Sequence, residues 1–406
     1  MSVYLRHRIH EHIMGLKEKI SKVKCRTVLS MLIFWGQIQN YMMRSSMSLI
    51  VLAMVKTEEK VAKGDTAVYE EACVRENIIG VNTTSIGNAE PVEGKVEWDE
   101  SMIPLVLSSF FWGYMSTQII GGRLAEMFGF KKVYGFGLFI PGVLMLLHPV
   151  AARIDVKLFL ALRALVGVFE AVTWPAMHAA TARWVPADQR SSWVAQTYFG
   201  STFGNIITLP MCGIVISSFG WEACFYIISA ITLTWSLVWY LLAFDQPKDH
   251  PRISPEELEE LSDIPVSVSR PPVPWLDILK SGPMWGTLLT DCANTFGISI
   301  FLGYGPVFMK YMLGLDIKTN GLLSGLPMLA RYLGGVVISR IADWLITSGR
   351  ITRLNGRRIF NSLSQVMPAV TIVCLGYAGC NVTAAVSFMV STLFLQTGFM
   401  ILFFRL

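Results

Sequence analysis

Two residues of opposite charge, Arg163 and Glu170, lie seven positions apart in residues 156–181, a stretch otherwise long and apolar enough to cross a membrane. A charge at the centre of a bilayer is costly, so an intramembrane acid and base predict a functional site. Seven residues make almost two helical turns, which places both side chains on one face about 10 Å apart. That spacing is too long for a direct salt bridge, and the face is expected to line a polar cavity. The alternative is that each charge pairs with a neighbouring helix and locks the bundle.

The composition indicates which class of protein holds this pair. Of 406 residues, 53% are hydrophobic and 16% are charged, whereas soluble domains are about 25% charged. A membrane-spanning helix needs about 20 apolar residues. Ten segments fit, near residues 27–55, 101–122, 132–151, 156–181, 190–218, 221–244, 283–310, 318–346, 357–380 and 382–404. We predict an all-α multi-pass protein of the lipid bilayer.

The loops between these segments predict the orientation. Residues 1–26 hold seven Lys and Arg, and further basic residues fall in alternate loops, which places the N-terminal segment in the cytosol. The loop 56–100 is acidic and carries the sequon Asn82-Thr83-Thr84, so Asn82 is a predicted glycosylation site on the outer side. The basic residues thus reflect topology, and no nucleic-acid partner is expected. The seven cysteines show neither a disulfide framework nor metal-ligand spacing, and Cys73 has no same-side partner apart from Cys380.

A change of composition divides the chain. Residues 245–282 are rich in proline and acids and form a predicted cytosolic linker between a six-helix bundle, 27–244, and a second bundle, 283–406. Within the linker, Ser254 precedes Pro255 and stands three residues before Glu257, which predicts a short surface helix through about Ser262.

A short motif occurs once in each bundle. It consists of Gly122, Glu126, Lys131 and Lys132 after the second span, and of Arg340, Asp343 and Arg357 after the eighth. The acid could hold a basic residue of a neighbouring helix and so form a cytosolic latch that gates the cavity. The alternative is a pair of charge clusters that only set topology.

Other polar residues could contribute to a site inside the membrane. Tyr41, Tyr114 and Gln118 could donate hydrogen bonds to a substrate, and His178, two turns beyond Glu170, could relay protons. Packing or simple hydrogen-bonding roles are the alternatives for all four. Gly200 and Gly204 have the spacing that lets helices approach closely. Pro175, Pro210, Pro306 and Pro327 are expected to kink or break helices.

Several of these motifs carry a family resemblance. The run from Gly122 to Lys132 resembles the motif between the second and third helices of the major facilitator superfamily. More specifically, residues 110–119, 163–170, 174–178, 220–226 and 250–254 resemble solute carrier family 17, which includes sodium/phosphate cotransporters, sialic acid transporters and vesicular glutamate transporters. The resemblance implies the twelve-helix facilitator fold.

The resemblance also implies roles for single residues. Arg44 and Arg163 match positions at which the family is thought to hold an anionic substrate, and Glu170 matches its proton-linked acid. Leu107 stands where vesicular glutamate transporters have a histidine, and Asn294, a further substrate-site position, stands in place of their arginine. Both departures argue against glutamate as the substrate.

These features together lead to a functional expectation. We expect a symporter of phosphate or a small organic anion, driven by sodium ions or protons, in the plasma membrane or an endolysosomal or vesicle membrane. It is expected to be no enzyme and to hold no other cofactor. Because the sequence ends near the end of the tenth span, two helices of the fold are expected to be missing. The alternative is therefore a shortened, non-transporting product that acts, if at all, as an interaction partner of a full-length copy.

Overall fold

The computed structural model describes residues 24–55, 96–261 and 274–397, and these parts are almost entirely helical. Asn82 and Cys73 lie outside them. The helices are α2 (Cys25–Ser45), α3 (Met47–Met54), α5 (Met102–Phe128), α6 (Phe130–Ile154), α7 (Val156–Glu170), α8 (Thr173–Trp184), α9 (Arg190–Phe219), α10 (Trp221–Leu242), η1 (Pro247–Asp249), α11 (Pro255–Glu260), α12 (Trp275–Lys280), α13 (Gly282–Tyr311), α14 (Ile317–Thr347), α15 (Arg353–Tyr377) and α16 (Val382–Leu395). Each of the first nine predicted spans coincides with one helix or with two consecutive helices, and the described part of the tenth contains α16.

In the part of the chain that the structure describes, seven helices are long and apolar enough to cross a membrane. Three predicted spans are not among them: the first and fourth are each broken into two helices, α2 with α3 and α7 with α8, and the described helix of the tenth, α16, has 14 residues. The second break follows from Pro175, which has no backbone N–H to donate to the carbonyl of Ala171, four residues earlier. At the first break, the hydroxyl groups of Ser46 and Ser48 bond to backbone carbonyls three residues back, an interaction that bends helices.

Glycines set the helix crossings of the first bundle. A Cβ atom on Gly200 would lie far inside contact distance of the Phe34 carbonyl, and one on Gly204 would lie 2.8 Å from the Ile38 carbonyl. The prediction that this pair permits close packing is thus confirmed, because it seats α9 directly on α2. Gly113 of α5 and Gly167 of α7 make an equally close crossing.

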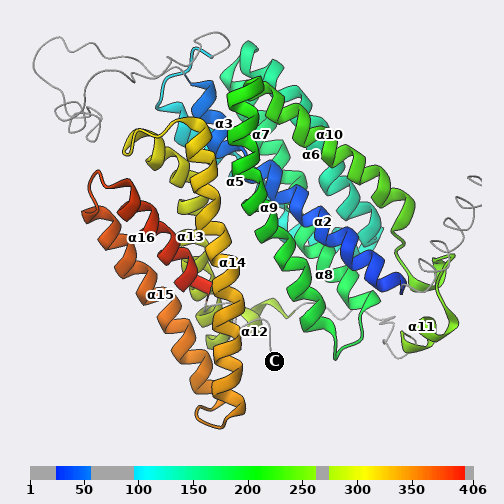
Figure 1. Cartoon of the computed structure of the whole chain (residues 1–406). Coiled ribbons are helices and arrows are strands. Elements are labelled where there is room, and N and C mark those ends of the chain that lie inside the picture. The colour runs from blue at the N-terminus through cyan, green and yellow to red at the C-terminus, as the bar shows by residue number, and fades with distance from the viewer. Residues whose placement is uncertain (1–23, 56–95, 262–273, 398–406) are drawn as a thin grey trace, which may run out of the picture.

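The two bundles meet along α9 and α14 (Figure 1). Gly321 lies against Gly213, and Gly325 lies against Pro210. At the same end of the molecule, Lys310 Nζ at the end of α13 donates to the Leu52 carbonyl of α3 at 2.8 Å. Tyr311 packs on the large apolar core of the first bundle. Contacts between the bundles are therefore close at the end that carries Met54 and Tyr311.

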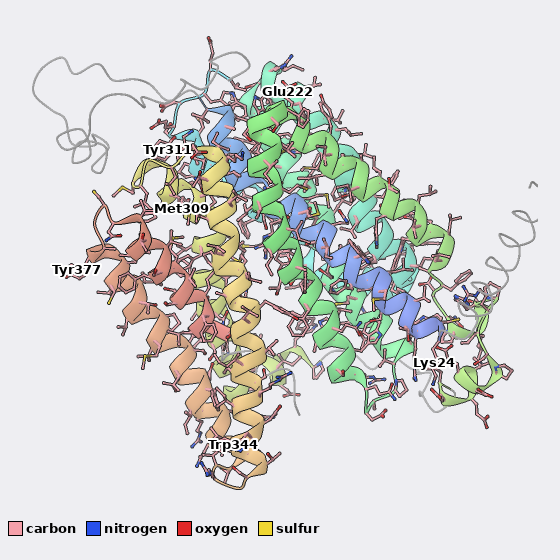
Figure 2. The ribbon with its side chains drawn as sticks, in the orientation of Figure 1. Lys24, Glu222, Met309, Tyr311, Trp344 and Tyr377 are labelled. Carbon is pink, nitrogen blue, oxygen red and sulfur yellow. The ribbon has the colours of Figure 1, made fainter. Side chains whose placement is uncertain are left out.

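The opposite ends of the bundles are apart. In Figure 1, α9 and α14 converge at the upper end and diverge below. Figure 2 shows Trp344, near the end of α14, well away from Lys24, which precedes α2. The bundles therefore separate toward the end that carries Lys24 and Trp344, which we call the open end.

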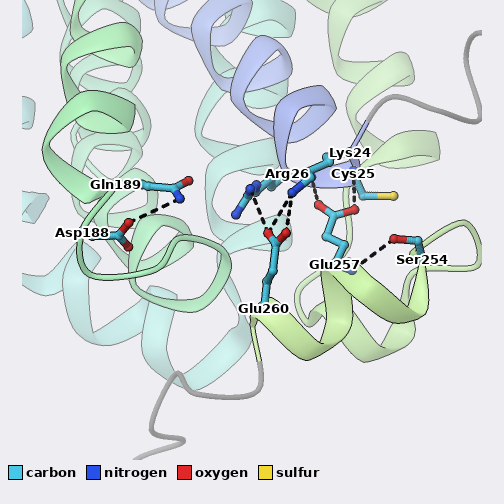
Figure 3. A network of polar contacts seen from close by, with 8 residues as sticks. All are labelled: Lys24, Cys25, Arg26, Asp188, Gln189, Ser254, Glu257 and Glu260. Carbon is cyan, nitrogen blue, oxygen red and sulfur yellow. Dashed lines mark hydrogen bonds and ion pairs between the residues drawn. The ribbon is translucent and has the colours of Figure 1, made fainter.

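The described part of the predicted linker folds back on the first bundle. The helix expected after Ser254 is confirmed as α11, whose N-cap Ser254 accepts a hydrogen bond from the Glu257 amide at 3.1 Å. It does not lie free on the surface, since Glu257 is only 2% exposed. Its carboxylate accepts hydrogen bonds from the Cys25 and Arg26 amides, at 2.8 and 2.9 Å (Figure 3).

A second acid strengthens this attachment. Glu260 pairs with Lys24 at 2.6 Å and with Arg26 at 2.9 Å. We call α11 with residues 24–26 the clasp. The first N–H groups of a helix have no partner within the helix, and the positive end of the helix dipole attracts an anion. Glu257 thus caps α2 with a carboxylate from a distant part of the sequence.

Replacing Glu257 with Gln should loosen the clasp, because it removes the charge from two charge-assisted hydrogen bonds, each worth about 1.5–3 kcal/mol. We expect the buried thiol of Cys25 to react with a maleimide roughly tenfold faster at constant pH, as a 1.4 kcal/mol weakening would give. Peptide mass spectrometry of the labelled Cys25 measures this. The matched control is Glu256→Gln, an exposed neighbour on the same helix, and equal labelling of both variants would contradict the capping role.

The clasp should also resist mild acid. The hydrogen bond from Lys24, together with the charge of Arg26, holds the pKa of Glu260 below the ordinary 4.5. Because the pKa is lowered in the folded protein, the contribution of this carboxylate to stability is present above pH 4.5 and is lost only as the pH falls through the lower folded value. Hydrogen exchange of the first α2 amides, corrected for intrinsic rates, should be equally slow at pH 7 and pH 5. Faster exchange of these amides at pH 5 than at pH 7 would contradict the predicted acid resistance of the clasp.

Candidate functional site

The acid and base of α7 lie in the interior of the first bundle. Arg163 is 2% exposed and Glu170 is fully buried. Neither Glu170 oxygen has a hydrogen-bond partner, nor do Nε and Nη1 of Arg163, and no ion pair within 4.0 Å joins the two residues. They interact only electrostatically across the two turns between them. A buried pair without hydrogen bonds is costly, so this arrangement is not explained as a device that locks the bundle.

The second cation of the site is Arg44, near the end of α2. Its guanidinium lies over four aromatic rings, 4.8 Å from the centroid of Phe111 and 5.4–5.6 Å from those of Tyr41, Phe110 and Tyr114. The ring of Phe110 also lies 5.4 Å from the Arg163 guanidinium. Two cations therefore share one aromatic ring, with a single acid beside them. Cation–π contacts balance part of the charge, and the remaining excess is positive.

The crossing of α5 and α7 brings these groups together. A Cβ atom on Gly167 would collide with the Phe110 carbonyl, and one on Gly113 would collide with the Ala164 carbonyl. The two backbones thus touch within one turn of Arg163 and Glu170, which places Phe110 and Tyr114 beside the charges. Glycine is required here because of the close approach of two backbones.

The break between α7 and α8 positions Glu170. Its carbonyl accepts a hydrogen bond from the Thr173 hydroxyl at 2.6 Å, and the same hydroxyl accepts one from Asn40 Nδ2 of α2 at 3.0 Å. The turn after Glu170 is thereby tied to the helix that carries Arg44. Beyond it, Trp174 lies edge-on to Tyr41 with ring centroids 6.4 Å apart, and 4.5 Å from the centroid of Tyr198.

Some predicted site residues join this cluster and others do not. Tyr41 and Tyr114 contact Arg44, whereas the exposed Gln118 and His178 have no contact with it among the described hydrogen bonds and ring contacts. Asn294 of α13 is 3% exposed, and its carbonyl accepts a hydrogen bond from Gln396 at 3.0 Å. Asn294 therefore belongs to the second bundle, whereas Arg44 and Arg163 belong to the first.

The predicted latch residues lie at the open end. Glu126 accepts a hydrogen bond from Arg123 of its own helix at 2.8 Å. The Lys131 amide donates to Asp245 at 2.8 Å, its side chain lies over Phe244, and Lys132 is exposed. A Cβ atom on Gly122 would lie 3.7 Å from Pro175, so this glycine is not required by close packing. In the second copy, Arg340 is exposed and Asp343 and Arg357 are half-buried. A latch between the bundles remains a prediction.

Sequence reasoning missed three charged residues that the structure makes prominent. Arg331 lies in the middle of α14, and its presence in an otherwise apolar span is the same signal that identified Arg163. Asp245 caps the start of α6 but was assigned to the linker. Lys310 joins the two bundles from the end of α13. A basic residue at a helix end is common, so the sequence gives no signal for this role. Among the described residues, no group of three or more His, Cys, Asp or Glu side chains could hold a metal ion.

This chain matches a known protein family and is similar in sequence to several named transporters. The model of the Major Facilitator Superfamily matches residues 33–405. Human sialin is 35% identical over 364 residues, which cover 89% of this chain and 72% of sialin. A Drosophila melanogaster protein named "Putative inorganic phosphate cotransporter" is 32% identical over 88% of this chain and 67% of its own. Vesicular glutamate transporter 1 of Xenopus laevis is 30% identical over 77% of this chain and 56% of its own.

Solved structures agree on the fold. A bacterial homologue of the human lysosomal transporter Spinster, in an inward-facing and occupied conformation, superposes with a TM-score of 0.59 at 12% identity, over 92% of this chain and 72% of that one. The inward-open xylose transporter XylE of E. coli superposes with a TM-score of 0.56 at 14% identity, over 92% of this chain and 80% of XylE. At these identities the likeness concerns the fold alone.

Replacing Gly167 with Ala should destabilise the protein, because the added methyl group forces α5 and α7 apart at the site. Overpacking of this kind costs about 1–3 kcal/mol. Thermal unfolding in detergent should show a lower midpoint for this variant. The control is Gly376→Ala in α15, where a Cβ atom meets nothing within 4 Å, and an equal midpoint for the two variants would contradict the tight crossing.

Proposed function

The chain belongs to the Major Facilitator Superfamily and, within it, to solute carrier family 17, and from this premise we propose that it carries a small anion across a membrane by alternating access, driven by a sodium or proton gradient. It is a multi-pass membrane protein of a family of secondary transporters. The substrate class and the coupling ion are the proposed part.

The observation that carries the anion assignment is the shared ring of Phe110, with Arg44 and Arg163 each centred 5.4 Å from it. Two guanidinium groups this close repel each other, and in a low-dielectric interior the repulsion is weakly screened. An anion between them would remove the repulsion and supply the acceptors that Arg163 Nε and Nη1 lack. The similarity to a putative inorganic phosphate cotransporter and to sialin is consistent with such a substrate.

Glu170 is the proposed coupling residue. Its carboxylate is fully buried and without a hydrogen bond, so a proton or a sodium ion would stabilise it. Because Arg163 lies on the same helix face, an anion on Arg163 and a cation on Glu170 favour each other's binding. This mutual preference is the requirement for symport.

The arrangement of the bundles supports alternating access. They are in close contact at the end of Met54 and Tyr311 and apart at the end of Lys24 and Trp344 (Figure 2). The proposed cytosolic side is the second of these, because basic residues gather there. Cys380 lies at the opposite end and is disulfide-bonded, which favours an oxidising, non-cytosolic compartment there. Glycosylation of Asn82 on that side, and a plasma or endolysosomal membrane, belong to the same proposal.

Replacing Arg44 or Arg163 with Ala should abolish anion uptake, because either change removes a cation that the substrate needs. We expect uptake of labelled phosphate or organic anions under an imposed sodium or proton gradient to fall at least 100-fold, with the protein still at the membrane. Glu170→Gln should retain anion exchange but lose the response to the gradient, since Gln cannot take up a proton or compensate a sodium charge.

The matched control is Arg153→Ala, which removes an exposed arginine paired with Glu222 at the end of α6. This surface pair is worth little, so uptake should stay near the unsubstituted level. Undiminished uptake by the Arg44 and Arg163 variants would falsify the proposed site. An unsubstituted chain present at the membrane without uptake of any probe would favour the alternative of a non-transporting interaction partner.

A further inference from the structure

Arg331 is a third intramembrane cation, and it belongs to the second bundle. It stands near the middle of the 31-residue helix α14, fourteen residues after Ile317 and sixteen before Thr347. The side chain is half-buried, its Nε atom is buried without a hydrogen-bond partner, and no described ion pair involves it. A cation at this depth without a partner is costly and is therefore expected to serve a function.

Arg331 shares a helix face with two polar residues that contact α13. Arg331 follows Asn320 and Ser324 by eleven and seven residues, spacings that keep all three on one face. Asn320 donates to the Pro306 carbonyl of α13 at 2.7 Å, and Ser324 contacts Met309 of the same helix. Arg331 lies on the continuation of this face toward the end of α14 that carries Trp344.

Counting along the two helices places Arg331 level with Asn294. From the contact between Asn320 and Pro306, eleven residues of α14 span about 17 Å and twelve residues of α13 span about 18 Å in the same direction. The two helices are antiparallel neighbours, so Arg331 and Asn294 reach the same depth. Asn294 is the position that the sequence already assigned to the substrate site.

The opposite bundle lies within reach of Arg331. The next residue, Tyr332, packs against Phe199 and Phe203 of α9, with ring centroids 5.4 and 5.3 Å apart. Arg331 itself interacts electrostatically with the Tyr41 hydroxyl, and the Tyr41 ring lies against Arg44. Tyr41 thus stands between a cation of the first bundle and a cation of the second.

An acid on the second bundle offers the competing explanation. Asp291 precedes Asn294 by one turn of α13, so it could neutralise Arg331 in a purely structural pair. No ion pair within 4.0 Å joins them among the described residues, and the electrostatic partner of Asp291 is Tyr198 of α9. Asp291 is exposed, so water can solvate it without help from Arg331.

We propose that Arg331 is a specificity-determining residue that binds a second negative charge of the substrate from the second bundle, opposite Arg44 and Arg163. This inference rests on the proposed function and narrows it. A substrate held by three cations carries at least two negative charges, as hydrogen phosphate, sulfate or a dicarboxylate does. A monoanion would leave Arg331 unpaired.

The test compares the transport of dianions and monoanions by the full chain. Uptake of labelled phosphate, sulfate, succinate and lactate is measured for the unsubstituted chain and for Arg331→Gln, Arg331→Lys and Asp291→Asn. The unsubstituted chain should prefer the multiply charged probes. Arg331→Gln should raise KM for these probes at least tenfold while KM for lactate changes less than twofold, and Arg331→Lys should recover most of the loss because it keeps the charge.

Each other outcome overturns the inference. An unchanged KM in Arg331→Gln, or uptake confined to lactate in the unsubstituted chain, removes the role in specificity while the transport function stands. If Asp291→Asn reproduces the Arg331→Gln phenotype, the two residues form a structural pair. No saturable uptake of any probe by the unsubstituted chain overturns the proposed function itself. Arg350→Gln, an exposed arginine over Trp344, controls for lost charge and should leave every KM unchanged.

Discussion

The cost of burying charge without a partner is the constraint on which the rest of this structure depends. Arg163 and Glu170 are almost completely removed from solvent, yet neither is satisfied by the protein around it. Such an arrangement persists only if the surrounding helices hold it more strongly than the charges oppose it. Phe110, stacked against both Arg44 and Arg163, supplies the partial compensation that a neutral ring can give without neutralising either cation.

Glycines supply the rigidity that this site requires. At Gly113 and Gly167, and again at Gly200 and Gly204, helix backbones touch, so the site helices cannot shift without losing contact along their length. In a membrane the lipid is as apolar as the side chains, so packing and interhelical hydrogen bonds hold helices together in place of the hydrophobic effect. A similar crossing at Gly213 and Gly321 joins the two bundles. The same device thus fixes the site within one bundle and joins that bundle to the other.

The charged groups at the open end have a different character. Glu257 and Glu260 of α11 hold the start of α2 through backbone amides and through Lys24 and Arg26 (Figure 3). These contacts attach residues 245–261 to the first bundle. A chain segment that looks like a linker by composition therefore extends the bundle, and the connection to the second bundle begins only after it.

The sequence by itself determined the helices and the positions of charge within them, because spacing along one helix follows from its fixed periodicity. It placed Arg163 and Glu170 on one face for the same reason, and the rule that found them applies equally to Arg331. It did not determine where helices break: of the four prolines expected to kink or break a helix, Pro175 stands at a break, whereas Pro210, Pro306 and Pro327 lie inside continuous helices. Only the tertiary structure decided that Arg44 and Arg163 share the ring of Phe110, that Glu257 caps α2, and that the bundles are closed at one end. These relations join residues far apart in the chain. They depend on how whole helix surfaces fit together, and no local pattern of residues records that fit.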